Sequence, residues 1–314
     1  MRALDSLEAD TRVIDAPDAP REMVEPPQGQ VLDDPERRRE ESAESRQRVE
    51  GDWDERPFKV DRAELARFDL KRAGLPDMSV ESAAKYIEEH RASRPWLAMT
   101  DRACPEARRI IAALDAADGH AHIRHEGWVT EEANRSRVAY REDPAQLDPE
   151  RRHAGIDGLR ENDKGHRSGD VTTRITDPDA FATAFIRGVE HPRVREALDR
   201  PTGSSKWPGE VAIPISDLLD PDDCRLCTGW RLEPVDGNID TARQNRSDWV
   251  TARAAGRKPD VPEPRAAPVS TFRGGEIVFA FAPNDSEKRY QVVTMFPRPA
   301  HQQSDVPLEN QLKE

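Results

Sequence analysis

Apolar residues recur at helical spacing between about residues 58 and 199. The clearest case is CPEARRIIAALDAADG, residues 104–119, whose apolar side chains share one face between Pro105 and Gly119. Proline in a first turn and glycine just past a last turn are typical of helix ends, so this segment is predicted to be a helix. Four further segments are predicted to be helical, the last three capped by Ser79, Thr130 and Asp177: residues 63–74, 78–92, 130–140 and 177–190.

The pattern changes after residue 208, where β-branched and aromatic residues alternate between clusters of turn residues. Four segments are predicted to be strands: residues 209–219, 224–235, 275–283 and 288–297. The last two strands are predicted to form a β-hairpin. Residues 141–172 are predicted to be a long loop, and residues 237–268 a polar insertion. Helices first and strands last predict an α+β fold, with helices packed on one face of an antiparallel sheet.

Composition divides the chain further. Hydrophobic residues make up 35 % and charged residues another 35 %, and the hydrophobic share is below the ~45–50 % of an ordinary globular chain. The deficit is concentrated at the N-terminus, where residues 1–57 hold almost no sustained apolar run. We therefore expect a disordered acidic arm (1–57), a helical linker or leader (58–95), the α+β domain (96–300) and a disordered tail (301–314).

Charge and cysteine content limit the partners. A net charge of −13 argues against a protein that coats duplex DNA, because phosphate contacts dominate such binding; a local basic cleft stays compatible with it. Three cysteines make no disulfide framework. No stretch has the length or apolar character of a signal peptide or membrane span. We expect synthesis in the cytoplasm, no membrane partner, and any export by a specialised secretion or injection system.

The segment GHAHIRHEGWV, residues 119–129, carries the most chemistry. It holds His120, His122 and His125, with Arg124 beside them. On a helix, His122 and His125 would share a face, and two histidines can supply an acid and a base near neutral pH. Arg124 adds a permanent cation suited to a phosphate. The alternative is that one histidine packs in the core while the others are solvated.

The order of these segments resembles the catalytic domains of bacterial polymorphic toxins of the RNase A-like and EndoU-like groups, as in contact-dependent growth-inhibition toxins. Such domains join an early G-H-x-x-x-x-H motif to a terminal Thr-x-[Tyr/Phe]-Pro motif. Here Gly119-His120 with His125 matches the first, and the segment Thr294 to Pro297 matches the second. The loops are longer than in the family, and its usual catalytic lysine has no clear counterpart. The resemblance covers about residues 115–300.

The resemblance implies a metal-independent endoribonuclease that cleaves RNA by 2′-OH transesterification and needs no cofactor, because the nucleophile belongs to the substrate. His125 would act as base or acid, with His120 or His122 as its counterpart. Arg124 would hold the phosphate, and Thr294 would donate a hydrogen bond to it. An immunity protein would be a second partner besides RNA.

Tyr290 lies on the same strand as Thr294. Because side chains on a strand alternate with period two, Tyr290 and Thr294 are expected to point to one side and to line one cleft, where Tyr290 would stack on a base or donate its hydroxyl. Packing on the sheet is the competing interpretation for Tyr290.

Three other interpretations stay open. Cys224 and Cys227 could bind a metal, although two thiols in a buried strand fit the spacing better. The α+β domain could be a non-catalytic module that binds a protein partner. The same histidines could serve a nucleotide-processing or ADP-ribosyl-transferring toxin, but the chain lacks the motif pattern expected of a transferase.

Overall fold

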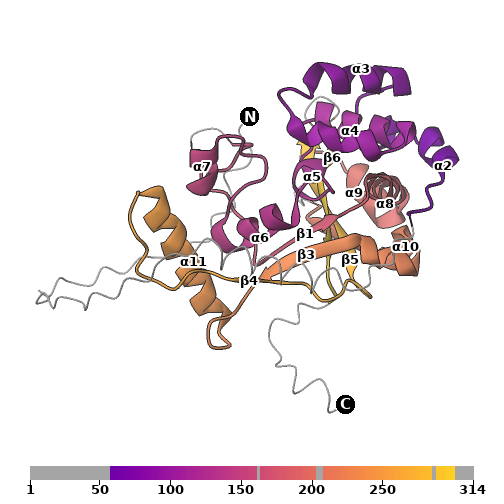
Figure 1. Cartoon of the computed structure of the whole chain (residues 1–314). Helices are drawn as coiled ribbons and strands as arrows, with labels where there is room; N and C mark the ends of the chain where they lie inside the picture. The colour runs from indigo at the N-terminus through magenta and orange to yellow at the C-terminus, as the bar shows by residue number, and fades with distance from the viewer. Residues whose placement is uncertain (1–56, 161–162, 203–207, 285–287, 301–314) are drawn as a thin grey trace, which may run out of the picture. The chain divides into compact units, whose positions relative to one another are not determined.

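The computed structural model describes residues 57–160, 163–202, 208–284 and 288–300 (Figure 1). The predicted disordered arm, apart from Pro57, and the predicted tail therefore lie outside the described residues. The helices preceding the first strand come in this order: α2 (Arg62–Arg67), the 3₁₀ helix η1 (Leu70–Ala73), α3 (Val80–His90), η2 (Pro95–Arg102), α4 (Pro105–Ala116), α5 (Ala121–Arg124), α6 (Glu131–Tyr140) and α7 (Pro149–His153). The later helices are α8 (Pro178–Glu190), α9 (Pro192–Leu198), α10 (Ile215–Leu218), η3 (Pro221–Leu226) and α11 (Ile239–Ala254).

The helix ends follow the sequence signals. The side chains of Ser79, Thr130 and Asp177 accept backbone N–H groups in the first turns of α3, α6 and α8, as predicted. Gly74, in the left-handed conformation, ends η1. The predicted helix over residues 63–74 is instead two short pieces, α2 and η1, separated at Phe68 and Asp69. Local capping therefore predicts where a helix starts better than how far it runs.

The strands form two antiparallel three-stranded sheets, and the α+β fold class is confirmed. The strands are β1 (Val171–Ile175), β2 (Glu210–Pro214), β3 (Cys227–Leu232), β4 (Ala266–Pro268), β5 (Glu276–Asn284) and β6 (Arg289–Arg298). One sheet has the order β1-β3-β4 and the other β2-β5-β6. The expectation of a single sheet was wrong, because β1 lies at the end of the predicted 141–172 loop and pairs with β3. The predicted polar insertion contains the long helix α11 and β4.

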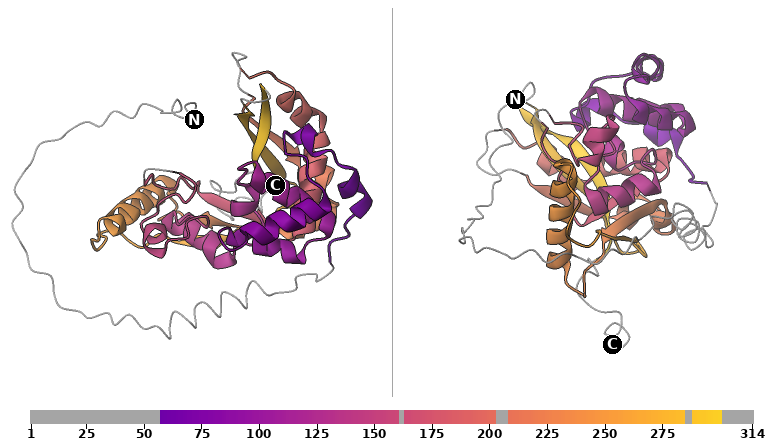
Figure 2. Two further views of the ribbon diagram at one scale, coloured as in Figure 1. Left: turned by 90° about the horizontal axis from the view of Figure 1, so that it is seen from above. Right: turned by 60° about the vertical axis from the view of Figure 1, so that its left-hand side comes forward.

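The main core extends across the predicted boundary at residue 96. Leu65, Leu70 and Leu75 are buried in the same apolar cluster as α4, α8 and the β5–β6 pair. Helix α8 packs so closely on β5 that a Cβ placed on Gly188 would lie 1.9 Å from the Phe279 ring. Figure 2 shows the β5–β6 pair beside α8 and α9 in views that differ from Figure 1. The segment from residue 58 to 95 is therefore part of the domain rather than a separate leader.

Strand β6 contains an irregularity that decides the position of the predicted site. Ala280 of β5 pairs with Thr294, but the next residue, Phe281, pairs with Val292, so Val293 is an extra residue in β6. A β-bulge of this kind reverses the alternation of side chains beyond it. Tyr290, Val292 and Met295 are buried in the main core. Thr294 therefore points to the face opposite Tyr290.

The outer edge of β6 is covered by segments from distant parts of the chain. A Cβ on Gly74 would lie 3.1 Å from Cβ of Gln291. The backbone N–H of His120 donates to the carbonyl of Val293 at 2.9 Å, and the hydroxyl of Thr173 donates to the carbonyl of Pro297. The two hydrogen bonds use backbone carbonyls that an open edge would leave without partners. They also bring the histidine segment against the last strand.

In the part of the chain that the structure describes, no helix has the length and apolar character needed to cross a membrane.

Candidate functional site

The two motifs of the toxin resemblance come together at the bulge of β6. The hydrogen bond from His120 to Val293 places His120 beside Thr294, and the rings of His125 and Phe296 lie 5.2 Å apart between centroids. Helix α5, a single turn, joins the two histidines and packs against β6 (Figure 1). Residues 119–125 therefore lie against residues 293–297, and these two segments form the candidate site.

The ring of His125 is held in one tautomer. Its Nδ1 lies 2.8 Å from the carbonyl oxygen of Thr173, and a carbonyl can only accept, so Nδ1 carries the hydrogen. Among the described residues, Nε2 has no hydrogen-bond partner, and it is not fully shielded from solvent. Burial lowers the pKa of His125 well below its ordinary value, and the charge of Arg137 adds to this effect. The neutral ring thus presents the lone pair of Nε2 as a base.

His120 is partly exposed, and its ring has no hydrogen-bond partner within the described ranges. Burial lowers its pKa to about 3, and the positive charges of Arg124 and Arg137 lower it as well. In the absence of a ligand the ring is neutral at pH 7. An anion beside it would counter both effects and favour protonation.

His122 does not share a face with His125, and its predicted catalytic role does not fit its position. Its Nε2 lies 2.9 Å from Oδ1 of Asp115, and its side chain is buried. Asp115 also accepts hydrogen bonds from Tyr86, Arg94 and Trp96. Helix α5 ends at Arg124, so the helical spacing that would align His122 with His125 is not maintained. His122 anchors α5 to the end of α4.

Burial acts to raise the pKa of Asp115. The hydrogen bond and charge of His122, together with the hydrogen bonds of Trp96 and Arg94, outweigh it and hold the pKa below the ordinary range. This carboxylate is therefore a structural centre that joins α3, η2, α4 and α5.

Arg124 is engaged by two carboxylates rather than open to a phosphate. Its guanidinium donates to Asp143 at 2.6 and 3.0 Å and to Asp157 at 2.9 Å, and only 11 % of its side chain is exposed. The predicted role as a phosphate clamp would require breaking buried ion pairs, which costs more free energy than a surface contact returns. The geometry contradicts that role.

These ion pairs belong to a closed ring of contacts. Asp157 accepts from Nδ1 of His166 at 3.2 Å, and Nε2 of His166 accepts from Arg137 at 3.1 Å. Arg137 then donates to the backbone carbonyl of Arg124 at 3.1 Å, which closes the ring. Since His166 donates through one nitrogen and accepts through the other, it is neutral. Two arginines and two aspartates balance the charge beneath the histidines.

Sequence reasoning missed this ring. His166 and Asp157 lie in the segment predicted to be a solvated loop, yet His166 is 2 % and Asp157 4 % exposed. Arg137 lies on α6. One buried arginine changes the spacing of apolar residues along a helix very little, so its burial was not predicted. The density of Asp, His and Arg between residues 141 and 172 was the one available signal, and it did not distinguish a solvated loop from a buried network.

One group of side chains has the composition of a metal site. Single ligand atoms of Asp143, Asp157 and His166 lie within 4.8 Å of one another. The guanidinium of Arg124 already bridges both carboxylates, so a metal ion would have to displace it. Cys224 and Cys227 belong to no such group in the described residues.

Thr294 carries a hydroxyl without a partner. Its Oγ1 is shielded from solvent, and no hydrogen-bonding group of the described residues contacts it. Such a hydroxyl costs free energy, since it has lost its contacts with water. A phosphate oxygen of a bound ligand would supply the missing acceptor, provided that the surrounding side chains move to admit it.

Tyr290 is not part of this site. Tyr290 is buried in the main core, and it also lines a hollow of about 200 Å³ near the start of β6. The expected common cleft of Tyr290 and Thr294 was wrong, because the period-two argument does not hold across Val293. The sequence gives no signal of the bulge, since VVTMF shows neither glycine nor a break in its β-branched pattern.

The bulge in β6 brings together His120, His125, Thr294 and Phe296. This arrangement is compatible with the resemblance to polymorphic toxins, which remains a prediction. Function therefore has to be argued from the site itself. Comparisons of this chain with family models, with curated proteins and with solved structures find no match.

Proposed function

We propose that this protein is an endoribonuclease of the bacterial polymorphic toxin type, which cleaves RNA by metal-independent 2′-OH transesterification. The observation that supports this most is the meeting of the two motifs, which lie far apart in the sequence. The His120 N–H donates to the Val293 carbonyl at 2.9 Å, and the His125 and Phe296 rings are 5.2 Å apart. Two histidines and a threonine hydroxyl without a hydrogen-bond partner lie close together here. Packing of the fold alone gives no reason for this combination.

His125 is the general base. Its Nδ1–H is held by Thr173, so the free lone pair of Nε2 takes the proton of the substrate 2′-OH. The 2′ oxygen then attacks the adjacent phosphorus and forms a new P–O bond. The bond from phosphorus to the 5′ oxygen breaks, which leaves a 2′,3′-cyclic phosphate on one product.

His120 is the general acid. It must be protonated to deliver a proton to the departing 5′ oxygen, and its pKa of about 3 in the free protein is too low for that at pH 7. The phosphate of the bound substrate raises this pKa, because a negative charge favours the imidazolium. The hydroxyl of Thr294 donates to a phosphate oxygen as charge develops there.

The test is incubation of the full-length protein with total RNA in EDTA, beside Thr294→Val. Valine matches the shape of threonine, and the lost hydroxyl has no partner among the described residues, so the variant is expected to fold normally. We expect a loss of cleavage of about 10²-fold, as for removal of one donor to a developing oxyanion. His125→Ala should abolish cleavage.

Thr241→Val is the matched control, because Thr241 is exposed on α11 and its hydroxyl has no hydrogen-bond partner among the described residues. It should cleave RNA at the wild-type rate. Intact RNA with folded wild-type protein would refute the ribonuclease proposal and favour a module that binds a protein partner. Equal cleavage by the wild type and Thr294→Val would remove Thr294 from the site.

A further inference from the structure

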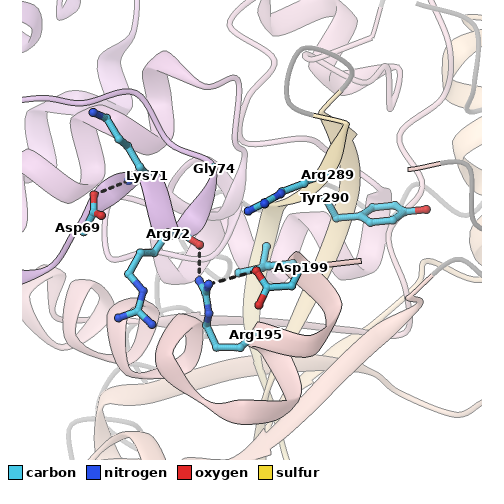
Figure 3. A pocket seen from close by; sticks show the side chains of 9 residues that line it. Asp69, Lys71, Arg72, Gly74, Arg195, Asp199, Arg289 and Tyr290 are labelled. Carbon is cyan, nitrogen blue, oxygen red and sulfur yellow. Dashed lines mark hydrogen bonds and ion pairs between the residues drawn. The ribbon is translucent and has the colours of Figure 1, made fainter. Parts of the chain in front are cut away.

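We infer that the hollow between η1, α9 and the start of β6 binds a backbone phosphate of the RNA strand, outside the cleavage centre, and that Arg289 is its principal cation. This inference rests on the proposed function. The hollow has a volume of about 200 Å³, and four cationic side chains line it: Lys71, Arg72, Arg195 and Arg289 (Figure 3).

Of the four cationic side chains, Arg289 is the one available to bind a phosphate. Lys71 pairs with Asp77, Arg72 with Glu190, and Arg195 with Asp199. Arg289 makes no hydrogen bond or ion pair through its side chain with any described residue, and it is exposed at the first position of β6. In Figure 3 its side chain extends from β6 towards η1 and α9. Asp69 and Asp199 are the two acidic side chains of the lining, and neither pairs with Arg289, so the lining itself carries more positive than negative charge.

The neighbouring pairs do not close the hollow to an anion. The side chains of Arg72 and Glu190 are 47 % and 39 % exposed, and those of Lys71 and Asp77 are 67 % and 74 % exposed. Ion pairs of this kind contribute little stability, so a phosphate can exchange for a carboxylate at small cost. Arg195 is held by the carbonyl of Arg72 and by Asp199, which fixes the floor against which the anion would lie.

The cleavage centre gives a reason for a separate phosphate contact. The two arginines beneath His120 and His125 are balanced by Asp143 and Asp157, so the centre offers little net positive charge. The whole chain carries a net charge of −13, which opposes RNA binding at long range. Affinity for a phosphate chain therefore depends on cations beside the centre.

The hollow lies on the same strand as the cleavage centre, at a distance that an RNA strand can span. Gly74 of η1 covers β6 at Gln291, and His120 covers the same edge at Val293. Val293 lies four positions after Arg289 on the strand, a span of about 13 Å at the usual rise of a strand. An RNA strand that leaves Thr294 and passes over the outside of η1, which covers this edge, would place a phosphate beyond the scissile one near Arg289.

Binding of a 2′-deoxy oligonucleotide of about twelve nucleotides tests this, because it lacks the attacking hydroxyl and cannot be cleaved by this chemistry. The dissociation constant of the full-length protein would be measured from low to moderate salt for the wild type, Arg289→Ala and Arg273→Ala. Arg273 is the matched control: it is an exposed arginine without a side-chain partner in the described residues, and it lies at the opposite end of the β5–β6 pair.

We expect Arg289→Ala to weaken binding and to lower the slope of log Kd against log salt by about 0.7, the value for one phosphate contact with a single strand. Arg273→Ala should match the wild type. Equal slopes for the two variants, or no binding by the wild type at low salt, would overturn the inference. An effect confined to Arg289→Ala in a protein that leaves RNA intact in EDTA would keep the subsite and refute the nuclease.

Discussion

Replacement of Glu126 by glutamine should stabilise the protein at alkaline pH. Glu126 is 0 % exposed, directly after His125, and no group of the described residues makes a hydrogen bond of good geometry with either carboxylate oxygen. The backbone N–H groups of Trp128 and Gly127 lie close enough to lower its pKa a little, but burial dominates and raises the pKa to about 8.

The size of the effect follows from linkage. The folded protein keeps the proton of Glu126 up to about pH 8, whereas the unfolded chain releases it near the ordinary value of 4.5. Stability is therefore complete below pH 4.5 and falls as the pH rises to about 8. At about 1.4 kcal/mol per pKa unit, the loss between pH 5 and pH 9 is about 4 kcal/mol. Glutamine has no proton to lose and resembles the neutral acid in shape.

The free energy of unfolding in urea, measured from pH 5 to pH 9 for the wild type and Glu126→Gln, checks this. The two proteins should agree within about 1 kcal/mol at pH 5, and the variant should be about 4 kcal/mol more stable at pH 9. Glu88→Gln, at an exposed position of α3, should follow the wild type throughout. A constant difference between wild type and Glu126→Gln across the pH range would refute the linkage argument.

Three further substitutions test the packing around the site by urea denaturation. Asp115→Asn should cost about 3–5 kcal/mol, since it breaks a buried ion pair and turns an acceptor into a donor; a cost below about 1 kcal/mol would contradict its central role. Gly188→Ala should cost about 3 kcal/mol, because its Cβ would meet Phe279 at 1.9 Å, whereas Gly165→Ala, with nothing nearer than 4.0 Å, should be close to neutral. Asp157→Asn should cost about 2–4 kcal/mol by opening the ring beneath the histidines, and an unchanged midpoint would show that the ring adds no stability.

The sequence predicts the local structure of this protein well. Ser79, Thr130 and Asp177 act as helix caps in the structure, because a cap depends only on residues within one turn. The strands β5 and β6 were predicted for a similar reason, since their pattern of β-branched and aromatic residues is local. The prediction that His120 and Thr294 lie close together came from the motif resemblance, because no local rule relates two segments so far apart in the sequence.

Contacts between distant segments could not be predicted in this way. Asp115 binds His122, and Asp157 binds Arg124, through side chains whose partners depend on the final packing. The alternation rule placed Tyr290 on the wrong face because one extra residue, Val293, is accommodated without any change in residue type. Polarity alone predicted a solvated loop where His166 is buried, since a satisfied buried network has the same composition as an exposed one.

The docking of His120 on Val293 has a consequence for the timing of synthesis. The two residues are 293 − 120 = 173 positions apart, so the cleavage centre forms only after a very long chain segment has closed on itself. A chain still emerging from the ribosome holds every histidine of the site before β6 exists. Neither Thr294 nor the carbonyl that receives His120 is present at that stage. If the protein cleaves RNA, the complete cleavage centre therefore forms only at the end of synthesis.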